Sequence, residues 1–309
     1  MFHRDNMIIK KIKLTIKNPK MVSFVQALLP YFLLNVLKKG MGYYPILVIS
    51  TLVSCVFSSE SNFAHNGVTA HRGNSEDFPE NTIPAFKSAL SLGVDWIELD
   101  IFKTKDGQIV VTHDANTSRV SDTDLQIEEK SYEALKSIDV AHDFRIRKKL
   151  SLKECPPESM PLLSEIIHLI MEQNKTRLSI QPKSNCVKEA IDIIKKLNAE
   201  AWVGFNDGSL SKMKEVKKEV NTIPVFWDRP ADSDIDEDIK IALKEGFESI
   251  VINQVGVTKA KVDKVHKAGI EAGAWTVNDP ETMKTLLGMG VDRIYTDDPR
   301  ALFKILEEK

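Results

Sequence analysis

The sequence predicts an α/β chain whose eight parallel strands close into a (β/α)8, or TIM, barrel with a β-hairpin insertion after strand 2. Three observations favour this fold. Beyond Gly67, short apolar runs with strand character alternate with amphipathic stretches of about ten residues, as in successive βαβ units. One run follows its predecessor across Lys105–Gln108, a turn signal containing Asp-Gly, which accounts for a ninth strand. The 255 residues from Cys55 onward match the length of about 250 typical of this barrel.

The elements alternate in a regular order. The expected strands are Val68–His71, Trp96–Phe102, Ile109–His113, Arg177–Pro182, Trp202–Phe205, Ile223–Trp227, Ser249–Ile252, Glu271–Val277 and Arg293–Thr296. The expected helices are Thr82–Leu92, Val187–Leu197, Leu210–Val220, Asp236–Lys244, Thr258–Ala268, Pro280–Met289 and Pro299–Glu308. We expect Asn81 to cap the first helix, which carries Pro84 in its first turn. Gly246, Gly269 and Gly290 follow three later helices, as residues that end helices do.

The hairpin and the chain after it decide how the active face is built. We expect Thr104 to pair with Ile109, which places His113 opposite Asp100. Residues 114–160 form a long connection whose one helical stretch is Tyr132–Ile138, and we interpret it as a lid over the face where barrel active sites form. An open, doubly wound sheet is the alternative architecture, but no glycine-rich phosphate loop follows the first strand.

Composition excludes several classes of protein. The formal charge of −2 gives no reason to expect nucleic acid as a partner, because nucleic-acid readers need a basic surface. With 42% hydrophobic and 28% charged residues, the chain is neither disordered nor a polytopic membrane protein. Three cysteines are too few for a disulfide scaffold. Cys155 and Cys186 could pair in an oxidising compartment or stay buried and unpaired.

The N-terminal segment differs from the rest of the chain in its charge. We expect residues 1–57 to be a signal or lipoprotein-anchor segment and residues 65–309 to be the barrel domain. Residues 1–40 hold eight lysines and arginines and one acid, whereas the remaining chain holds 34 basic and 43 acidic residues. Within Tyr44–Phe57, an apolar run of about 13 residues is short for a bilayer span but right for a secretory signal.

The end of this run suggests where the protein goes. Leu52-Val53-Ser54-Cys55 resembles the bacterial lipoprotein signal, in which Cys55 would become the lipidated N-terminus. We therefore expect an extracytoplasmic protein, periplasmic or secreted, with membrane association through a lipoprotein anchor at Cys55 as one form. A plain signal peptide cut near Ser58 and an uncleaved anchor are the alternatives. Translation from Met41 instead of Met1 is a further alternative.

Carboxylates and histidines are expected at the ends of neighbouring strands. Glu98 and Asp100 share one face of their strand because side chains alternate. Two carboxylates inside a barrel are costly unless something positive compensates them, and a hard divalent cation is the simplest answer. The alternative is a pair of surface carboxylates at a strand end. His71 and Arg72 end the first strand, and the hairpin brings His113 close to them.

The next strand adds a further cation. Gln181 and Lys183 lie on one face of it, and Lys183 and Arg72 can both bind an anionic substrate. A metal with these cations would bind a phosphate and neutralise the charge that develops on its oxygens. Two histidines on opposite sides would supply a base and an acid. The set predicts phosphodiester cleavage.

With these residues in place, the sequence resembles the glycerophosphodiester phosphodiesterase family of phospholipase C-like TIM barrels. The matching stretches are His71-Arg72-Gly73, Pro79-Glu80-Asn81-Thr82, Glu98-Leu99-Asp100, Lys105-Asp106-Gly107, His113-Asp114, Met160-Pro161-Leu162-Leu163, Trp275-Thr276-Val277-Asn278 and Thr296-Asp297. Their order and spacing are also similar, and the resemblance covers about residues 67–307. The resemblance implies hydrolysis of a small-molecule glycerophosphodiester to an alcohol and sn-glycerol 3-phosphate, with Mg²⁺ or Ca²⁺ as cofactor.

The resemblance also implies a role for each site residue. His71 and His113 would be the catalytic acid and base, Arg72 and Lys183 would hold the phosphate, Trp275 would wall the substrate pocket, and Glu98, Asp100 and Gln181 would bind the metal. The alternative for Trp275 is an ordinary core aromatic. Phe205 and Trp227 could line the same pocket, with core packing at least as good an interpretation. Glu80 and Asn81 are interpreted as mainly structural.

One position departs from the family pattern. Most members carry glutamate where this chain has Gln181, so the site has one negative charge fewer and we expect weaker or differently tuned metal binding. Two other functions stay open. One is a phosphodiesterase of intact phospholipid or lysophospholipid, similar to phospholipases D or C. The other is a non-catalytic glycerophosphodiester-binding protein.

Overall fold

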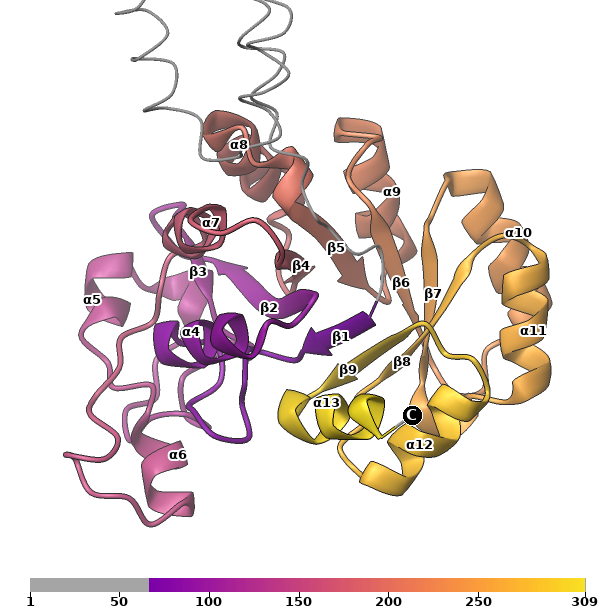
Figure 1. The fold of residues 1–309 in the computed structure, drawn as a ribbon. Helices are drawn as coiled ribbons and strands as arrows, with labels where there is room; N and C mark the ends of the chain where they lie inside the picture. Colours follow the sequence, from indigo (N-terminus) through magenta and orange to yellow (C-terminus); the bar gives the residue numbers. More distant parts are fainter. Residues whose placement is uncertain (1–66, 309) are drawn as a thin grey trace, which may run out of the picture. The chain divides into compact units, whose positions relative to one another are not determined.

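The computed structural model describes residues 67–308 and contains the closed parallel barrel that the sequence predicts (Figure 1). The strands are β1 (Gly67–Ala70), β2 (Trp96–Lys103), β3 (Ile109–Val111), β4 (Arg177–Pro182), β5 (Val203–Asp207), β6 (Val225–Arg229), β7 (Ser249–Asn253), β8 (Glu271–Trp275) and β9 (Arg293–Thr296). They follow the order β1-β9-β8-β7-β6-β5-β4-β2-β3, and β1 also pairs with β2, which closes the cylinder. All pairs within the cylinder are parallel, so the predicted TIM barrel is confirmed. The predicted N-terminal segment, Cys55 and the predicted domain boundary lie outside the described residues.

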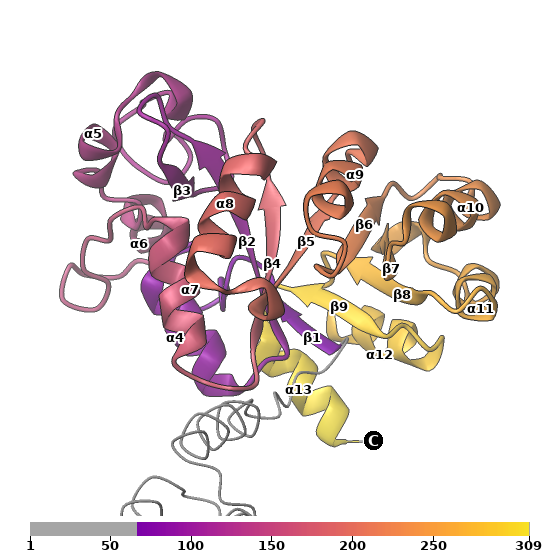
Figure 2. The same ribbon diagram turned by 90° about the horizontal axis from the view of Figure 1, so that it is seen from above.

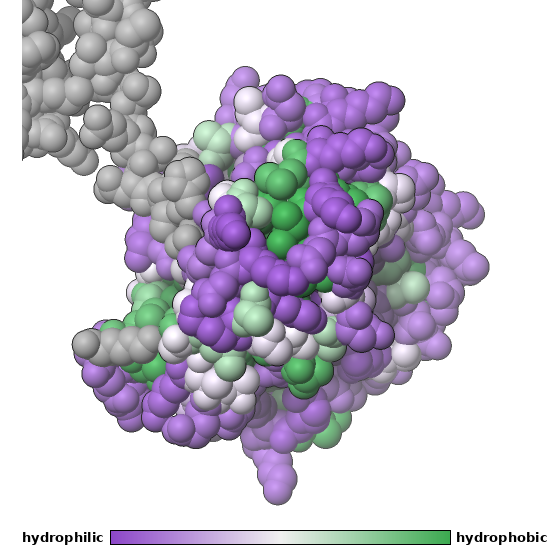
Figure 3. Space-filling model, turned by 90° about the vertical axis from the view of Figure 1, so that its right-hand side faces the viewer, coloured by the Kyte–Doolittle hydropathy of each residue, from purple (hydrophilic) through white to green (hydrophobic). Residues whose placement is uncertain are grey.

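Helices cover the outside of the barrel between successive strands (Figure 2). They are α4 (Ile83–Leu92), α5 (Tyr132–Lys136), α6 (His142–Arg147), α7 (Leu163–Met171), α8 (Val187–Leu197), α9 (Leu210–Glu219), α10 (Ile235–Glu245), α11 (Lys259–Lys267), α12 (Pro280–Gly288) and α13 (Pro299–Glu307), with short 3₁₀ helices η1 (Ile127–Glu129), η2 (Glu200–Trp202) and η3 (Gln254–Gly256). Every helix expected from the sequence is present, whereas α6 and α7 were not expected. Figure 3 shows that one face of the molecule is mainly hydrophilic, with separate hydrophobic areas. Among residues 67–308, no helix is both long and apolar enough to span a bilayer.

The alternation of side chains along each strand divides the core into two layers. Ile97 and Leu99 of β2 belong to the outer layer, beneath the helices. Trp96 points the other way and meets Phe226 of β6 inside the barrel, with 4.9 Å between the ring centroids. Glu98 and Asp100 alternate with Ile97 and Leu99, and so share the inner face with Trp96. The two carboxylates therefore point into the barrel, as the sequence predicts.

Two aromatic residues considered for the substrate pocket belong to the outer layer instead. Phe205 and Trp227 are both buried in the core beneath the helices. The Trp227 ring lies 5.7 Å from the Phe247 ring, and its Nε1 donates to the carbonyl oxygen of Gly208. Core packing is therefore their role in the fold. Their inward neighbours, Asn206 and Asp228, are the second-to-last residues of the same strands.

The hairpin forms, but its register differs by one residue from the prediction. Lys103, not Thr104, pairs with Ile109, so Asp100 faces Thr112 and His113 lies one residue further along. The cause is the length of the turn. Thr104 N donates to the Gln108 carbonyl at 2.9 Å, which leaves a three-residue loop in which Gly107 has a left-handed φ of +80°.

The start of α4 also differs from the prediction. Thr82, not Asn81, is the N-cap, and its hydroxyl accepts from Ala85 N at 3.5 Å. Asn81 has a left-handed φ of +57°, and its side chain is directed to Asp100 instead. Because Thr82 caps the helix, the Asn81 side chain is free to bond Asp100 at the site.

The long connection after β3 is a packed layer rather than an extended loop. It contains η1, α5 and α6, and α5 confirms the helical stretch expected from Tyr132. One apolar cluster within it joins Ile127, Leu135 and Val140 to Phe102 and Val110 of the β2–β3 hairpin. The two cysteines left open by the sequence, Cys155 and Cys186, are both buried and unpaired.

Candidate active site

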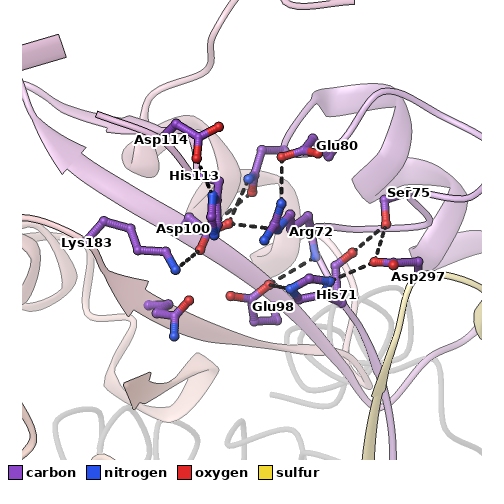
Figure 4. A network of polar contacts seen from close by, with 12 residues as sticks. His71, Arg72, Ser75, Glu80, Glu98, Asp100, His113, Asp114, Lys183 and Asp297 are labelled. Carbon is purple, nitrogen blue, oxygen red and sulfur yellow. Dashed lines mark hydrogen bonds and ion pairs between the residues drawn. The ribbon is translucent and has the colours of Figure 1, made fainter. Parts of the chain in front are cut away.

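The residues predicted to carry the chemistry gather at the carboxyl ends of β1, β2 and β4 (Figure 4). His71 and Arg72 directly follow β1, and Lys183 directly follows β4. Arg72 Nε lies 3.3 Å from Asp100 Oδ2, and Lys183 Nζ lies 3.2 Å from Asp100 Oδ1. His71 Nε2 lies 4.0 Å from Glu98 Oε2. One buried carboxylate is therefore held between two basic side chains, with its neighbour beside a histidine.

The remaining predicted residues differ in how closely they join this group. His113 lies beside Asp100 despite the change in hairpin register (Figure 4), and Gln181 is the partner of Asp100 in the β2–β4 ladder. Trp275 ends β8 and packs against the inner aromatic cluster that includes Trp96. Within residues 67–308, no hydrogen bond or ion pair joins Trp275 to the polar group, and its Nε1 is buried without a partner.

The pKa values of the two inner carboxylates are shifted in opposite directions. Glu98 and Asp100 are 1% and 0% exposed. Burial and the nearby charge of Asp100 raise the pKa of Glu98 to about 7. Burial acts on Asp100 in the same direction, but the charges of Arg72 and Lys183 outweigh it and lower the Asp100 pKa. Asp100 is therefore the firmly ionised member of the pair.

His71 is fixed by a carboxylate from the far end of the chain. Its Nδ1 donates to Asp297 Oδ1 at 2.7 Å, and Ser75 Oγ donates to the same oxygen at 3.0 Å. Burial lowers the His71 pKa, but the bond to Asp297 and the charge of Glu98 outweigh it, so the pKa is raised. The Nδ1 contact fixes the ring and leaves Nε2 on the side of Glu98.

His113 is fixed in the same way by its neighbour in sequence. Its Nδ1 donates to Asp114 Oδ1 at 2.7 Å, and Arg119 holds the other oxygen of Asp114. Burial lowers the His113 pKa; the charge of Asp100 opposes this shift, and Arg72 adds to it. The two histidines thus share an Nδ1–carboxylate arrangement, while their pKa values move in opposite directions.

The turn after β1 brings backbone as well as side chains to the site. Arg72 has a left-handed φ of +58°, and its backbone N donates to Glu98 Oε2 at 3.0 Å. Gly73 follows with φ +84°, and a Cβ there would lie 2.8 Å from the Ala85 carbonyl carbon. Only glycine fits this close approach to α4. Strained backbone of this kind persists where the surroundings hold it, often at functional sites.

Several carboxylate oxygens at the site are suited to a hard cation. Glu98 Oε1 and Asp100 Oδ1 are buried without a hydrogen-bond partner, although Asp100 Oδ1 faces Lys183. Among the described residues, no three His, Cys, Asp or Glu side chains converge as a ready metal cluster. An amide at position 181 is consistent with this, because its oxygen could add a neutral third ligand beside Asp100. Two carboxylates and one amide therefore fit a divalent cation such as Mg²⁺ or Ca²⁺.

Sequence reasoning did not predict which contacts hold the site residues in place. Asp297 and Asp114 anchor the histidines, and Asn81 Nδ2 donates to Asp100 Oδ2 at 2.9 Å. Glu80 accepts from Arg72 at 3.0 Å and from both terminal nitrogens of Arg119 at 2.7 Å. A signal existed for two of them, since Asp114 directly follows His113 and Asp297 directly follows the last strand. Arg119 lies in the long connection, where the sequence carries no such signal.

Comparison with known proteins connects the geometry to a family. A model described as the glycerophosphoryl diester phosphodiesterase family matches residues 71–301. A glycerophosphodiester phosphodiesterase from Bacillus altitudinis is 30% identical over 250 residues, covering 78% of this chain and 98% of the relative. One from Caldanaerobacter subterraneus is 31% identical with the same coverage. A human lysophospholipase D is 24% identical, covering 75% of this chain and 83% of its own.

Solved structures share the fold. A phosphodiesterase from Oleispira antarctica, in complex with the product sn-glycerol-3-phosphate, has a TM-score of 0.67 and 23% identity, covering 78% of this chain and 96% of its own. A glycerophosphodiester phosphodiesterase from Thermotoga maritima has a TM-score of 0.62 and 23% identity, covering 78% of this chain and 99% of its own.

Proposed function

The chain belongs to the glycerophosphodiester phosphodiesterase family, and we propose that it hydrolyses glycerophosphodiesters to an alcohol and sn-glycerol 3-phosphate by metal-dependent acid–base catalysis. One observation carries the proposal. Two histidines, each anchored through Nδ1 by a carboxylate, stand beside a buried carboxylate pair and two basic side chains at one end of a barrel. That set meets the needs of phosphodiester cleavage, which requires charge neutralisation as well as proton transfer.

Each residue has a part that follows from its contacts. Arg72 and Lys183 bind the phosphate, since both approach Asp100 from the open end and can turn from it to an anion. His71 and His113 act through Nε2, one accepting the proton of the attacking water and the other giving a proton to the leaving alcohol. Trp275 forms an apolar wall for the substrate.

A divalent cation would be held by Glu98, Asp100 and the amide oxygen of Gln181. When bound, it would supply positive charge to the phosphate oxygens. Asp100 would then be shared between the cation and the two basic side chains, and Asn81 keeps its carboxylate oriented. The Asp297 and Asp114 carboxylates stabilise a proton on the histidine that each contacts.

The test is the release of sn-glycerol 3-phosphate by the full chain from a panel of glycerophosphodiesters, each with Mg²⁺, Ca²⁺ or chelator. We expect release with at least one headgroup and loss of release with chelator. Measurable substrate binding without release under any condition would contradict the proposal and favour a binding protein.

A second substrate class is favoured by one comparison, the similarity to a human lysophospholipase D. We propose it as the alternative within the same chemistry. The full chain is offered glycerophosphocholine and lysophosphatidylcholine at equal concentration, and the products are identified. Faster turnover of lysophosphatidylcholine would overturn glycerophosphodiesters as the preferred class.

We also propose that the protein is exported, as a secreted form or as a lipoprotein anchored through Cys55. The support is the basic segment followed by a short apolar run that ends in Leu52-Val53-Ser54-Cys55. Mass spectrometry of the mature N-terminus tests it, with a lipidated Cys55 or a cut near Ser58 as the expected result. An unmodified Met1 in the soluble cytosolic fraction would contradict it.

A further inference from the structure

Asn278 contacts the Asp297 carboxylate at the oxygen that His71 does not use. It lies in the loop between β8 and α12, and its Nδ2 donates to Asp297 Oδ2 at 2.6 Å. Its Oδ1 accepts from the backbone N of Asp297 at 2.9 Å and from Thr296 Oγ1 at 3.2 Å. One amide group therefore holds both the side chain and the backbone of the residue that fixes His71.

These contacts determine which way the Asn278 amide is turned. The backbone N of Asp297 can only donate a hydrogen bond, so the group that it meets must be the amide oxygen. The amide nitrogen is then the group beside Asp297 Oδ2. Burial raises the Asp297 pKa, but the bond and charge of His71 and the bonds from Asn278 and Ser75 outweigh it and lower the pKa to about 2. Both oxygens of the carboxylate therefore act as acceptors.

The Asp297 carboxylate needs a contact at each oxygen to keep the orientation that His71 requires. Its side chain is 32% exposed, and rotation of a carboxylate about its last bond is only weakly restricted. His71 Nδ1 and Ser75 Oγ both meet Oδ1 (Figure 4). Ser75 Oγ also lies 2.8 Å from the His71 carbonyl oxygen, so its single proton serves one acceptor at a time. The contact at Oδ2 comes from Asn278.

The loop that carries Asn278 is itself held by its two preceding residues. Val277 N donates to the Tyr295 carbonyl oxygen at 2.8 Å. The Thr276 carbonyl oxygen accepts from Gln254 Nε2 at 2.7 Å. The amide therefore projects from a fixed backbone, as a group that orients another should. Removal of the side chain alone would leave both of these loop contacts in place.

The second histidine has a matching arrangement. His113 Nδ1 donates to Asp114 Oδ1, and Arg119 Nε donates to Asp114 Oδ2. Each imidazole thus meets one oxygen of a carboxylate whose other oxygen is held by a further side chain. A neutral amide holds it on the His71 side, and a guanidinium holds it on the His113 side.

We propose that Asn278 is a positioning residue for His71: it holds Asp297 at its second oxygen and its backbone, and so keeps the imidazole fixed with Nε2 directed into the site. The inference rests on the proposed function in taking His71 as one of the two proton-transfer groups. It needs no bound cation and no particular charge on His71. The Nδ1 atom carries a proton both in the charged imidazole and in the neutral form that donates to Asp297.

Proton NMR of the full chain, without substrate or added metal, tests the contact directly. The quantity measured is the rate at which the ring Nδ1 proton of His71 exchanges with water, and the signal is assigned by its absence in His71→Ala. In Asn278→Ala we expect this exchange to become about tenfold faster or more, because a hydrogen bond to a charged group is lost. The Nδ1 proton of His113 should be unaffected. Asn221→Ala, at an exposed asparagine after α9, is the matched control and should change neither signal.

Two further variants separate positioning of the carboxylate from support of the backbone. Asn278→Asp keeps an acceptor for the backbone N of Asp297 but places a second carboxylate where the amide now donates. Exchange at His71 should therefore be as fast as in Asn278→Ala. Arg119→Met should speed exchange at His113 and not at His71. With glycerophosphocholine as substrate, Asn278→Ala should lower kcat about tenfold or more and leave KM within about twofold of the wild type.

Five results would overturn the inference. Three concern exchange in the variants: an unchanged His71 proton in Asn278→Ala, equal acceleration at His71 and His113, and slow exchange retained in Asn278→Asp. The others are a wild-type His71 proton that exchanges too fast to observe and an unchanged kcat in Asn278→Ala.

Circular dichroism and thermal unfolding show whether each variant is folded. If Asn278→Ala does not fold, Asn278→Asp decides alone. Release of no sn-glycerol 3-phosphate by the wild type would contradict the proposed function, while the NMR result would still decide whether Asn278 holds His71.

Discussion

The two ends of the barrel interior handle buried charge in opposite ways. At the amino ends of the strands, the Arg293 guanidinium lies 3.8 Å from the Phe226 ring centroid and 4.7 Å from that of Trp96. Arg177 lies 4.0 Å from the Trp96 ring. At the carboxyl ends, Glu98 and Asp100 meet basic side chains and histidines that are partly exposed.

The two ends differ in whether the groups that contact the buried charges can be exchanged for a ligand. An aromatic face packed inside the core is fixed, so the arginine end is a closed arrangement that stabilises the fold. The lysine and arginine beside Asp100 are single-charge groups on flexible side chains. A substrate anion can replace Asp100 as their partner, and a metal cation can replace them beside Asp100. Buried charge at one end is therefore expected to matter for stability, and at the other for activity.

The largest effect is expected from the histidines at the carboxyl end. His113→Ala removes a proton-transfer group and should lower kcat about 10³-fold with glycerophosphocholine as substrate, while thermal unfolding stays close to that of the wild type. The matched control is His168→Ala on α7, which should keep full activity. A loss of only a few-fold for His113→Ala would mean that His113 is not an acid or base here.

Removal of the divalent cation should be the next largest effect. Dialysis against chelator should lower turnover about 10²-fold or more, because charge on the phosphate would no longer be neutralised, and added Mg²⁺ or Ca²⁺ should restore it. Initial rates measured against free cation concentration check this. Full activity in chelator would remove the need for a cation and leave Arg72 and Lys183 as the sole neutralising groups.

A substitution at the arginine end should lower stability and leave kcat nearly unchanged. Arg293→Met removes the guanidinium between Trp96 and Phe226 and leaves Glu271 Oε2, now 3.9 Å from Arg293 Nη2, without that partner. We expect a loss of about 3 kcal/mol in the free energy of unfolding, measured by urea denaturation. The kcat of the folded fraction should stay within about threefold of the wild type, because this end does not reach the substrate. A large fall in kcat with unchanged stability would break the distinction between the ends.

The smallest effect is expected where the long connection meets the site. Arg119→Met removes the two-nitrogen contact with Glu80 and the bond to Asp114. Since these carboxylates orient Arg72 and His113, kcat should fall about tenfold with little change in KM. Stability should change by less than about 1 kcal/mol, because the Arg119 side chain is 42% exposed and its ion pairs are screened by solvent. The Arg147→Met variant on α6, which loses an exposed pair with Asp143, is the control and should be fully active.

Local patterns account for what the sequence could predict. The inward direction of Glu98 and Asp100 follows from strand alternation, and the closed barrel follows from repeated βαβ units. The predicted hairpin register was wrong by one residue. The length of the turn depends on the hydrogen bond between Thr104 and Gln108, and the amino-acid composition of the turn does not determine that bond. The same limit applies to Asn81, whose backbone conformation frees it from the helix cap.

Contacts between distant segments could not be predicted. Asp297 is 226 residues from His71, and Asp228 is 47 residues from Gln181, so only the folded barrel brings these pairs together. Two strands also end two residues later than predicted, since β5 and β6 extend past Phe205 and Trp227. That extension places Asn206 and Asp228 on the inner wall. Polar residues at the carboxyl ends of barrel strands are therefore worth treating as site candidates even beyond the apolar run.

Under the proposed function, the carboxyl end of the barrel holds a cation and a phosphate together. A crystal of the full chain grown with Mn²⁺ and sn-glycerol 3-phosphate tests it directly. We expect an anomalous peak within ligand distance of Glu98 and Asp100, with the phosphate on Arg72 and Lys183. A peak elsewhere, or a phosphate that contacts neither basic side chain, would contradict it.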